Sequence, residues 1–315
     1  MHSRDAGATL EGPAIGWRLV DLLISVRRSS VARPLRSVKS LLLLLPALLL
    51  VAILATGLVG LVWHSLHRFD TFLAVQGRFS FTQYRQAVSD PQFKTVFMRT
   101  IGMSGLTAAI ALALALPFSI SMARARSRTT RLALMVIIFV PYLTGDITRT
   151  FGWLATLGPQ GPLMWITGKL GIHLPPLIGT LWAVGLGSVQ VLVPAAVVIL
   201  LPAVLRLDPE LDDAASTLGA RPFQTFFRVT LPQLRLACLG ALTACWAFSM
   251  GEFADPAVLG QGIKDYVGNF LQGRYLSVGD PPLGSAVGMI LLATVATGAG
   301  LILGFGRLRL PRRRV

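Results

Sequence analysis

Two acidic residues at the end of an apolar run are the clearest candidates for chemistry in this sequence. Glu252 and Asp255 are three positions apart, directly after the uncharged residues 236–251, and no cation stands among their immediate neighbours. A carboxylate beside a membrane-crossing run needs a partner or water. The pair therefore predicts either an outer mouth that receives a cationic group, led by Glu252, or two acids at a wet outer interface.

A second pair of charges follows another apolar run, residues 132–145. Asp146 and Arg149 are three apart, so on a helix they share a face and can pair with each other. The alternative is a role in a solute pathway, because charges near a bilayer often have one. Nearby indole rings would add cation–π contacts to such a pathway. The candidate pathway residues are Asp146, Arg149, Trp153, Trp246, Glu252 and Asp255.

Other residue types do not gather into an active site. The four histidines are scattered along the chain, and Cys238 and Cys245 are seven residues apart, about 10 Å on a helix and too far for a disulfide. A membrane-embedded enzyme would need clustered His, Asp or Ser chemistry. The phosphate-cradling pattern G-x4-G-K-[ST] is also missing from the sequence. We therefore expect no catalytic residue, no metal site and no cofactor bound by this chain.

The elements that carry these residues follow from the apolar runs. The chain of 315 residues is 53% hydrophobic and 14% charged, whereas soluble domains carry about 25% charged residues. Four uncharged runs of 24, 24, 36 and 26 residues can each cross a hydrocarbon core of about 30 Å. Two shorter runs, residues 132–145 and 236–251, become long enough only if they extend into the charges that follow. The sequence thus predicts an all-α integral membrane protein with six transmembrane helices.

Basic residues set the expected orientation. The two terminal regions and the loops at residues 123–131 and 205–235 hold 20 Lys and Arg residues, whereas the alternate loops hold 7. The positive-inside rule then places both termini in the cytoplasm. Because the Arg residues flank apolar runs, the net charge of +15 indicates a lipid bilayer and not nucleic acid as the partner. The expected regions are a basic tail at 1–38, a first span at 39–64, a core with five spans at 65–306, and a basic tail at 307–315.

A cytoplasmic loop at residues 206–232, here called the coupling loop, is more than a connector. Asp208 suits a helix N-cap, Pro209 the first helical position, and Gly219 a left-handed stop. The expected helix of about ten residues is too short to be stable alone in water. It therefore needs a surface to dock against, which is either another subunit or its own helix bundle.

The spacing within this loop resembles a known signature. Asp213-Ala214-Ala215, Gly219, Val229 and Leu231-Pro232 fit the pattern E-A-A-x3-G-x9-I-x-L-P, with Asp for Glu and Val for Ile. That pattern is the EAA motif of the permease subunits of ABC importers, in which the loop docks on the ATPase. The resemblance implies ATPase coupling by Asp213, Ala214, Ala215, Gly219, Leu231 and Pro232.

Further segments are similar to the spermidine/putrescine branch of these permeases. They are residues 81–84, 89–91, 146–153, 207–209, 251–253 and 282–286, and the likeness covers residues 70–305. Permeases for iron(III), sulfate and opines share parts of this pattern, so these solutes stay as alternatives to a polyamine.

The resemblance implies a type I ABC importer permease fold in a bacterial inner membrane. It also implies three kinds of partner: ATPase subunits that bind ATP and Mg, a second permease (a homologue or another copy), and a periplasmic substrate-binding protein. An ion-coupled secondary transporter is the alternative of another class. Such a transporter would carry coupling charges at the bilayer midplane.

Overall fold

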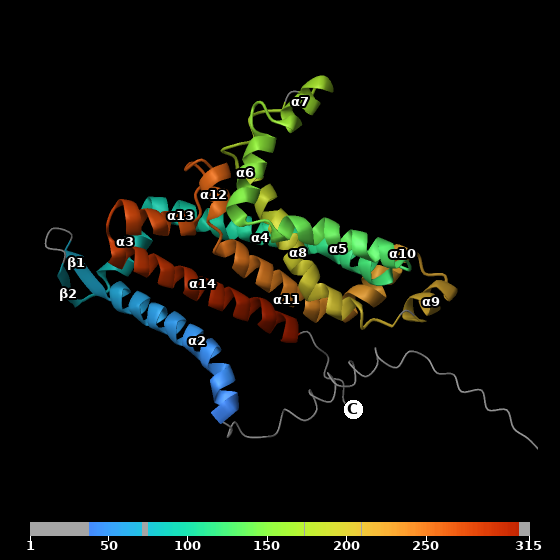
Figure 1. The fold of residues 1–315 in the computed structure, drawn as a ribbon, viewed down its shortest axis with the longest axis horizontal. Coiled ribbons are helices and arrows are strands. Elements are labelled where there is room, and N and C mark those ends of the chain that lie inside the picture. Colours follow the sequence, from blue (N-terminus) through green and yellow to red (C-terminus); the bar gives the residue numbers. More distant parts are fainter. Residues whose placement is uncertain (1–37, 71–74, 173, 209, 309–315) are drawn as a thin grey trace, which may run out of the picture. The chain divides into compact units, whose positions relative to one another are not determined.

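The computed structural model describes residues 38–70, 75–172, 174–208 and 210–308, and they are almost all helical. The chain divides between Val59 and Gly60 into two units. The elements, labelled in Figure 1, are α2 (Val38–Ser65), β1 (His67–Asp70), β2 (Val75–Phe79), α3 (Thr82–Ser89), α4 (Pro91–Arg124), α5 (Arg128–Leu143), α6 (Asp146–Leu157), α7 (Pro162–Lys169), α8 (Leu181–Val204), α9 (Glu210–Thr217), α10 (Pro222–Thr225), η1 (Phe226–Thr230), α11 (Leu231–Met250), α12 (Ala254–Leu259), α13 (Val267–Gln272), η2 (Gly273–Ser277) and α14 (Pro281–Leu308).

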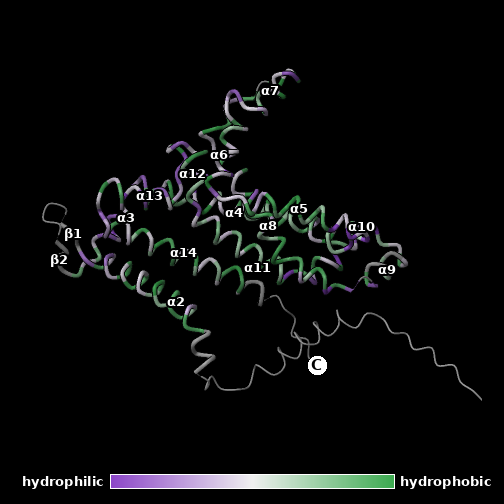
Figure 2. The backbone as a smooth tube through the Cα atoms, viewed as in Figure 1, coloured by the Kyte–Doolittle hydropathy of each residue, from purple (hydrophilic) through white to green (hydrophobic). Residues whose placement is uncertain are grey.

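Within the described residues, five helical segments are long and apolar enough to cross a membrane: Leu44–Ser65, Pro91–Arg124, Leu181–Val204, Pro222–Met250 and Pro281–Gly304. A sixth span arises if α5 and the following segment Asp146–Lys169, bent by 99°, are counted together. Hydrophobic residues predominate along these helices in Figure 2. Five of the six predicted spans are therefore found at the predicted places, and the third is present if the bent pair is counted as one broken span.

One predicted span end is wrong. We expected the third and fifth spans to extend into the charges that follow them. The third does so if it is counted as one span, because α5, which ends at Leu143, is long enough only together with Asp146–Lys169. The fifth does not, because α11 ends at Met250 before Glu252. The fifth span gains its length at its other end, because α10 and η1 run directly into α11 from Pro222. Keeping carboxylates out of a continuous span avoids the cost of a buried charge.

Three helices of the second unit make the core that carries the site. α4, α8 and α11 pack against one another, and α14 packs against α11. Small residues permit this close approach, as at Ala108, Ala196 and Ala241, which are fully buried. The absence of a side chain at Gly298 of α14 likewise makes room for the ring of Trp246 of α11, which occupies the place that a β-carbon would need.

A short hairpin follows α2 and was not predicted from the sequence. β1 and β2 pair antiparallel, with His67 opposite Phe79. Helix α3 holds its base, because Gln83 Nε2 donates to the His67 carbonyl oxygen at 3.0 Å and Tyr84 Oη to Ser65 Oγ at 2.8 Å. These contacts give a structural role to residues 81–84.

The start of α4 is fixed by one carboxylate. Asp90 Oδ1 accepts from the backbone N–H of Gln92 at 2.8 Å, as an N-cap does. Its Oδ2 forms a 2.8 Å ion pair with Arg274 Nη2 of η2. Asp90 thereby ties the beginning of α4 to the segment before α14.

The coupling loop folds as its caps predict. Helix α9 covers eight residues, the Glu210 N–H donates to Asp208 Oδ1 at 3.0 Å, and Gly219 has φ +79°. The π-helical turn η1 precedes Pro232, the second residue of α11. That wider turn suits Pro232, which would clash with a carbonyl of the preceding α-helical turn. Pro209 lies outside the described residues, as do residues 1–37 and 309–315 of the predicted tails.

Candidate functional site

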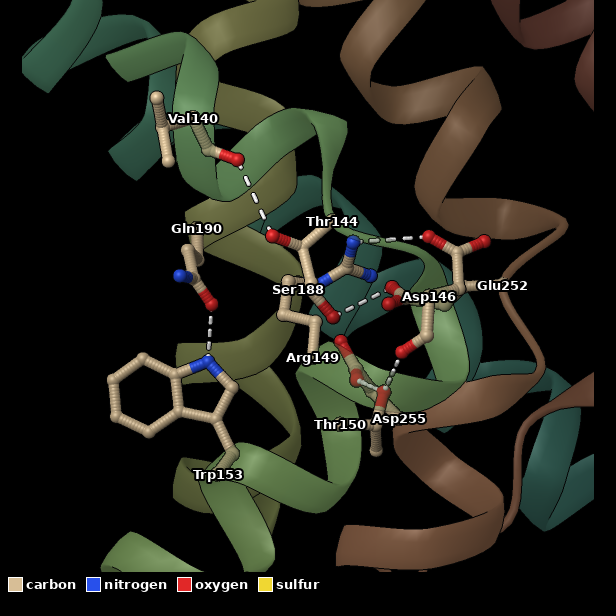
Figure 3. Close-up of polar contacts among 10 residues, drawn as sticks. All are labelled: Val140, Thr144, Asp146, Arg149, Thr150, Trp153, Ser188, Gln190, Glu252 and Asp255. Atoms are coloured by element: carbon tan, nitrogen blue, oxygen red, sulfur yellow. Dashed lines mark hydrogen bonds and ion pairs between the residues drawn. The ribbon is translucent and has the colours of Figure 1, made fainter. Parts of the chain in front are cut away.

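A cleft of about 720 Å³ opens between the start of α6 and the end of α11. It brings together three of the six predicted pathway residues, Asp146, Arg149 and Glu252 (Figure 3). The remaining lining is apolar or small. In full it consists of Gly145, Asp146, Ile147, Thr148, Arg149, Phe248, Gly251, Glu252, Phe253 and Ala254.

Asp255 lies behind this cleft and is fully buried. Thr150 of α6 donates to its Oδ1 at 2.6 Å, whereas its Oδ2 has no hydrogen-bond partner among the described residues. On the other side, Gly187 of α8 leaves room for the carboxylate, since a β-carbon there would lie 2.6 Å from Oδ2. Asp255 thus joins α12 to α6 and α8. Because it is fully buried, it does not lie at a wet outer interface, which was one of the two predicted alternatives.

Glu252 lies just after the span that ends at Met250. Its Oε2 accepts a 2.6 Å hydrogen bond from Ser188 Oγ of α8. Burial raises the pKa of the Glu252 carboxyl well above its ordinary value, and the neighbouring Asp255 adds to the rise. The Ser188 hydroxyl and the charge of Arg149 act in the opposite direction. Glu252 therefore keeps a proton to higher pH than a free glutamate does.

Asp146 and Arg149 form the ion pair that their spacing allows. Arg149 Nη1 lies 2.9 Å from Asp146 Oδ1, and the side chains are 7% and 66% exposed, respectively. The guanidinium is therefore drawn into the protein, while its partner faces the open side of the cleft. Since the charge of Arg149 also acts on Glu252, the pair does not stand apart from the acids.

Trp153 lines a second cleft, of about 400 Å³, beside the first. Its indole Nε1 donates to Gln190 Oε1 of α8 (Figure 3). The second cleft is lined by Pro141, Thr144, Thr148, Arg149, Gly152, Trp153, Thr156 and Gln190.

Trp246 is placed elsewhere, in the core between α11 and α14. It is 9% exposed and packs within the largest hydrophobic cluster. Its ring lies against Gly298, so the predicted indole face is not offered to either cleft.

Sequence reasoning missed the residues around the acids and the indole. Thr150 and Ser188 donate to the acids, Gly187 leaves room for Asp255, and Gln190 accepts from Trp153. Tyr266 is fully buried, and burial, with Glu252 and Asp255 adding to it, raises the pKa of its hydroxyl. Ser188 and Gln190 did leave a signal, because both are polar residues inside an otherwise apolar run.

The predicted coupling residues lie together on the coupling loop. Asp213, Ala214 and Ala215 belong to α9, Gly219 ends it, and Leu231-Pro232 begins α11. Beside them Leu218 and Phe223 are 88% and 74% exposed. Phe223 and Phe227 lie ring to ring at 4.6 Å. The loop thus presents apolar side chains on its surface, while the side chain of Asp213 is outside the described part.

Among the described residues, no three His, Cys, Asp or Glu side chains lie close enough to hold a metal ion. The clefts instead combine one cation, two carboxyls and an indole ring, with the buried carboxyl of Asp255 behind them. Such a set can bind and select a charged solute.

Comparison with known proteins identifies the family of this chain. Residues 115–314 match the family described as binding-protein-dependent transport system inner membrane component. The spermidine/putrescine transport system permease protein PotB of Haemophilus influenzae is 32% identical over 212 residues, which are 66% of this chain and 73% of that protein. PotB of Escherichia coli strain K12 is 28% identical over 231 residues, 72% of this chain and 82% of that protein.

The fold is shared with a solved structure as well. A chain of a bacterial ABC transporter involved in the import of the acidic polysaccharide alginate superposes with a TM-score of 0.72 at 15% identity, covering 92% of this chain and 100% of that one. The match shows the type I importer permease fold that the EAA motif implied. The chain belongs to the family of binding-protein-dependent transport system inner membrane components, and it is a multi-pass permease subunit of an ABC importer.

Proposed function

We propose that this permease subunit passes a small cationic solute, a polyamine such as spermidine or putrescine, into the cytoplasm. The observation that carries the proposal is two neighbouring acids, Glu252 in the lining of the first cleft and Asp255 buried behind it, where the one cation of the lining is already paired with Asp146. An ammonium group would balance the excess negative charge. The names of the two PotB relatives support the same class of solute.

The coupling loop is proposed to dock on a separate ATPase subunit. Support comes from the EAA spacing, the capped helix α9, and the exposed apolar side chains of Leu218 and Phe223. An eight-residue helix is unstable alone, so a docking surface would stabilise it. Movement of that ATPase would then be passed to α11, because α10 and η1 run into α11 without a break.

The remaining parts of the importer follow from this assignment. ATP and Mg would be bound by the ATPase subunits, and this chain would supply no catalytic residue and no cofactor. A second permease would complete the pathway, and a periplasmic binding protein would deliver the solute. The basic loops support cytoplasmic termini, and the coupling loop would then lie on the same side as the ATPase.

Uptake of radiolabelled putrescine and spermidine by cells that express the whole importer tests the proposal. We expect saturable, ATP-dependent uptake that excess unlabelled polyamine blocks and excess sulfate, ferric iron or opine does not. Glu252→Gln should lower uptake about tenfold or more through a raised KM, as expected for loss of one partly buried charge contact.

Asp265→Asn serves as the matched control, because Asp265 is also an acid but does not line the first cleft. Its uptake should match that of the unchanged chain. Competition by sulfate or iron instead of polyamine, or unchanged uptake with Glu252→Gln in a normally assembled importer, would contradict the proposal.

A further inference from the structure

Arg149 occupies the boundary between the two clefts. The first cleft contains the acids Asp146 and Glu252, and the second contains the indole of Trp153. The two linings share only two residues, Thr148 and Arg149. A solute that passes directly from one cleft to the other would move past Thr148 and the guanidinium.

The guanidinium is held incompletely. Its Nη1 pairs with Asp146 at 2.9 Å, yet its Nε is buried and has no hydrogen-bond partner among the described residues. A buried guanidinium in an optimised structural pair would have its donors satisfied, since an unmet charged donor is costly. Arg149 thus sits where a cation is attracted without being fully bound.

The charges around Arg149 explain this attraction. Asp146 faces it on α6 itself, Glu252 acts on it from the end of α11, and Asp255 lies behind Thr150 on α12. Two carboxyls therefore act on one cation, and a third lies behind Thr150. A solute with an ammonium group would seek the same carboxylate oxygens.

We propose that Arg149 is a specificity-determining residue, a built-in cation that competes with a cationic solute for Asp146 and Glu252. The solute enters the acidic cleft by displacing the guanidinium toward the second cleft, whose lining Arg149 shares. An anionic solute gains nothing from this exchange, because it would leave Glu252 unpaired. The inference rests on the proposed function for the identity of the natural solute. The competition between Arg149 and a cation for the carboxylates does not depend on that identity.

A structural ion pair and a competing cation make different predictions. Loss of either member of a structural pair should impair the protein in the same way. If Arg149 competes, Arg149→Gln should favour entry of a cation, whereas Asp146→Asn should oppose it by leaving Arg149 free to hold Glu252.

Charged thiol reagents test this without knowledge of the solute. The assembled importer, with Cys238→Ala and Cys245→Ala to remove the two native thiols, would carry Thr148→Cys at the boundary of the clefts. The measurement is the ratio of modification rates by a positively and a negatively charged methanethiosulfonate. We expect Arg149→Gln to raise this ratio about three- to tenfold, the range for one partly screened charge. Asp146→Asn should lower it.

A double variant separates competition for the Glu252 carboxylate from a general electrostatic effect of the Arg149 charge. In the Glu252→Gln background, Arg149→Gln should change the logarithm of the ratio by less than half of its change in the chain that keeps Glu252. The reason is that the carboxylate for which Arg149 and the reagent compete is then missing. Ser277→Cys, an exposed position outside both clefts, is the control and should give one ratio in all variants.

Three results would overturn the proposal: a ratio that Arg149→Gln leaves unchanged, changes of the same sign for Arg149→Gln and Asp146→Asn, or fully additive effects with Glu252→Gln. A cysteine at position 148 that neither reagent modifies would do so as well, since a solute pathway must admit molecules of that size. None of these readouts depends on polyamine uptake, so failure of the proposed solute is seen separately in the uptake assay.

Discussion

At Gly187 a side chain of any size would collide with the site. A β-carbon there would lie 2.6 Å from Asp255 Oδ2, and on its other side the carboxylate is held by the hydrogen bond from Thr150. We expect Gly187→Ala to push Asp255 out of place and to cost about 1–3 kcal/mol of stability, as overpacking does. The loss should appear as a lower melting temperature of the purified importer and as reduced uptake.

Gly185→Ala is the matched control on the same helix. Its β-carbon would meet the end of the flexible Met103 side chain at 3.3 Å, and that side chain can move aside. If Gly185→Ala and Gly187→Ala are equally harmful, the tight fit around Asp255 is not the cause.

Glu252 should make solute uptake depend on pH. Its pKa lies well above the ordinary value of 4.5, mainly through burial and then through Asp255, while Ser188 and Arg149 oppose the shift. The negative charge therefore appears only as the pH rises through the raised pKa. Since an alkylammonium stays charged over this range, the KM for a polyamine should fall as the pH rises.

Steady-state uptake between about pH 5 and pH 8 measures this effect. The Glu252→Gln importer should lose most of the pH dependence while keeping a high KM throughout. A KM that rises with pH in the unchanged importer would contradict the assignment of Glu252 as the titrating group.

The acids illustrate what a sequence can and cannot reveal about single residues. Glu252 and Asp255 stood out because they are uncompensated charges next to an apolar run. The burial of Asp255 could not be predicted, because its partner Thr150 is 105 positions away and its space depends on Gly187 of a third helix. Trp246 was misplaced for a similar reason, since the gap that receives it is made by Gly298 on α14.

The coupling loop is the element in which local rules were sufficient. Its cap at Asp208 and its left-handed Gly219 follow from residue preferences within a few positions. The bend of 99° after α5 and the length of the fifth span depend on packing and charge burial over longer distances. They were therefore predicted wrongly or not at all.

Gly219 gives a direct test of this element. It has φ +79° and no atom within 4 Å of the place of a β-carbon, so a substitution there acts through the backbone alone. We expect Gly219→Ala to cost about 1 kcal/mol and to weaken retention of the ATPase during purification. Gly219→Asn should have a smaller effect, because asparagine tolerates the left-handed conformation. Equal losses for both substitutions would show that the backbone conformation is not the cause.

For the whole molecule, composition and the order of apolar runs were sufficient to predict the helical class and the places of five spans, with the sixth depending on whether the bent pair is one span. The runs are so long and uncharged that lipid is the medium in which they are stable. The hairpin β1–β2 was not predicted, because its base is held by contacts from Gln83 and Tyr84 of α3, which lie 16 and 19 positions further along the chain than their partners. The two clefts likewise exist only once α6, α8 and α11 are assembled.

The central claim is that this permease subunit works with a separate ATPase through its coupling loop. The most direct test is purification of the tagged chain in mild detergent, followed by an assay of ATP hydrolysis in the purified material. We predict that ATPase subunits co-purify and hydrolyse ATP, and that Gly219→Asp, with the same amount of permease recovered, removes both the subunits and the activity. A chain that is recovered alone, or an ATPase that Gly219→Asp leaves fully bound and active, would contradict the account.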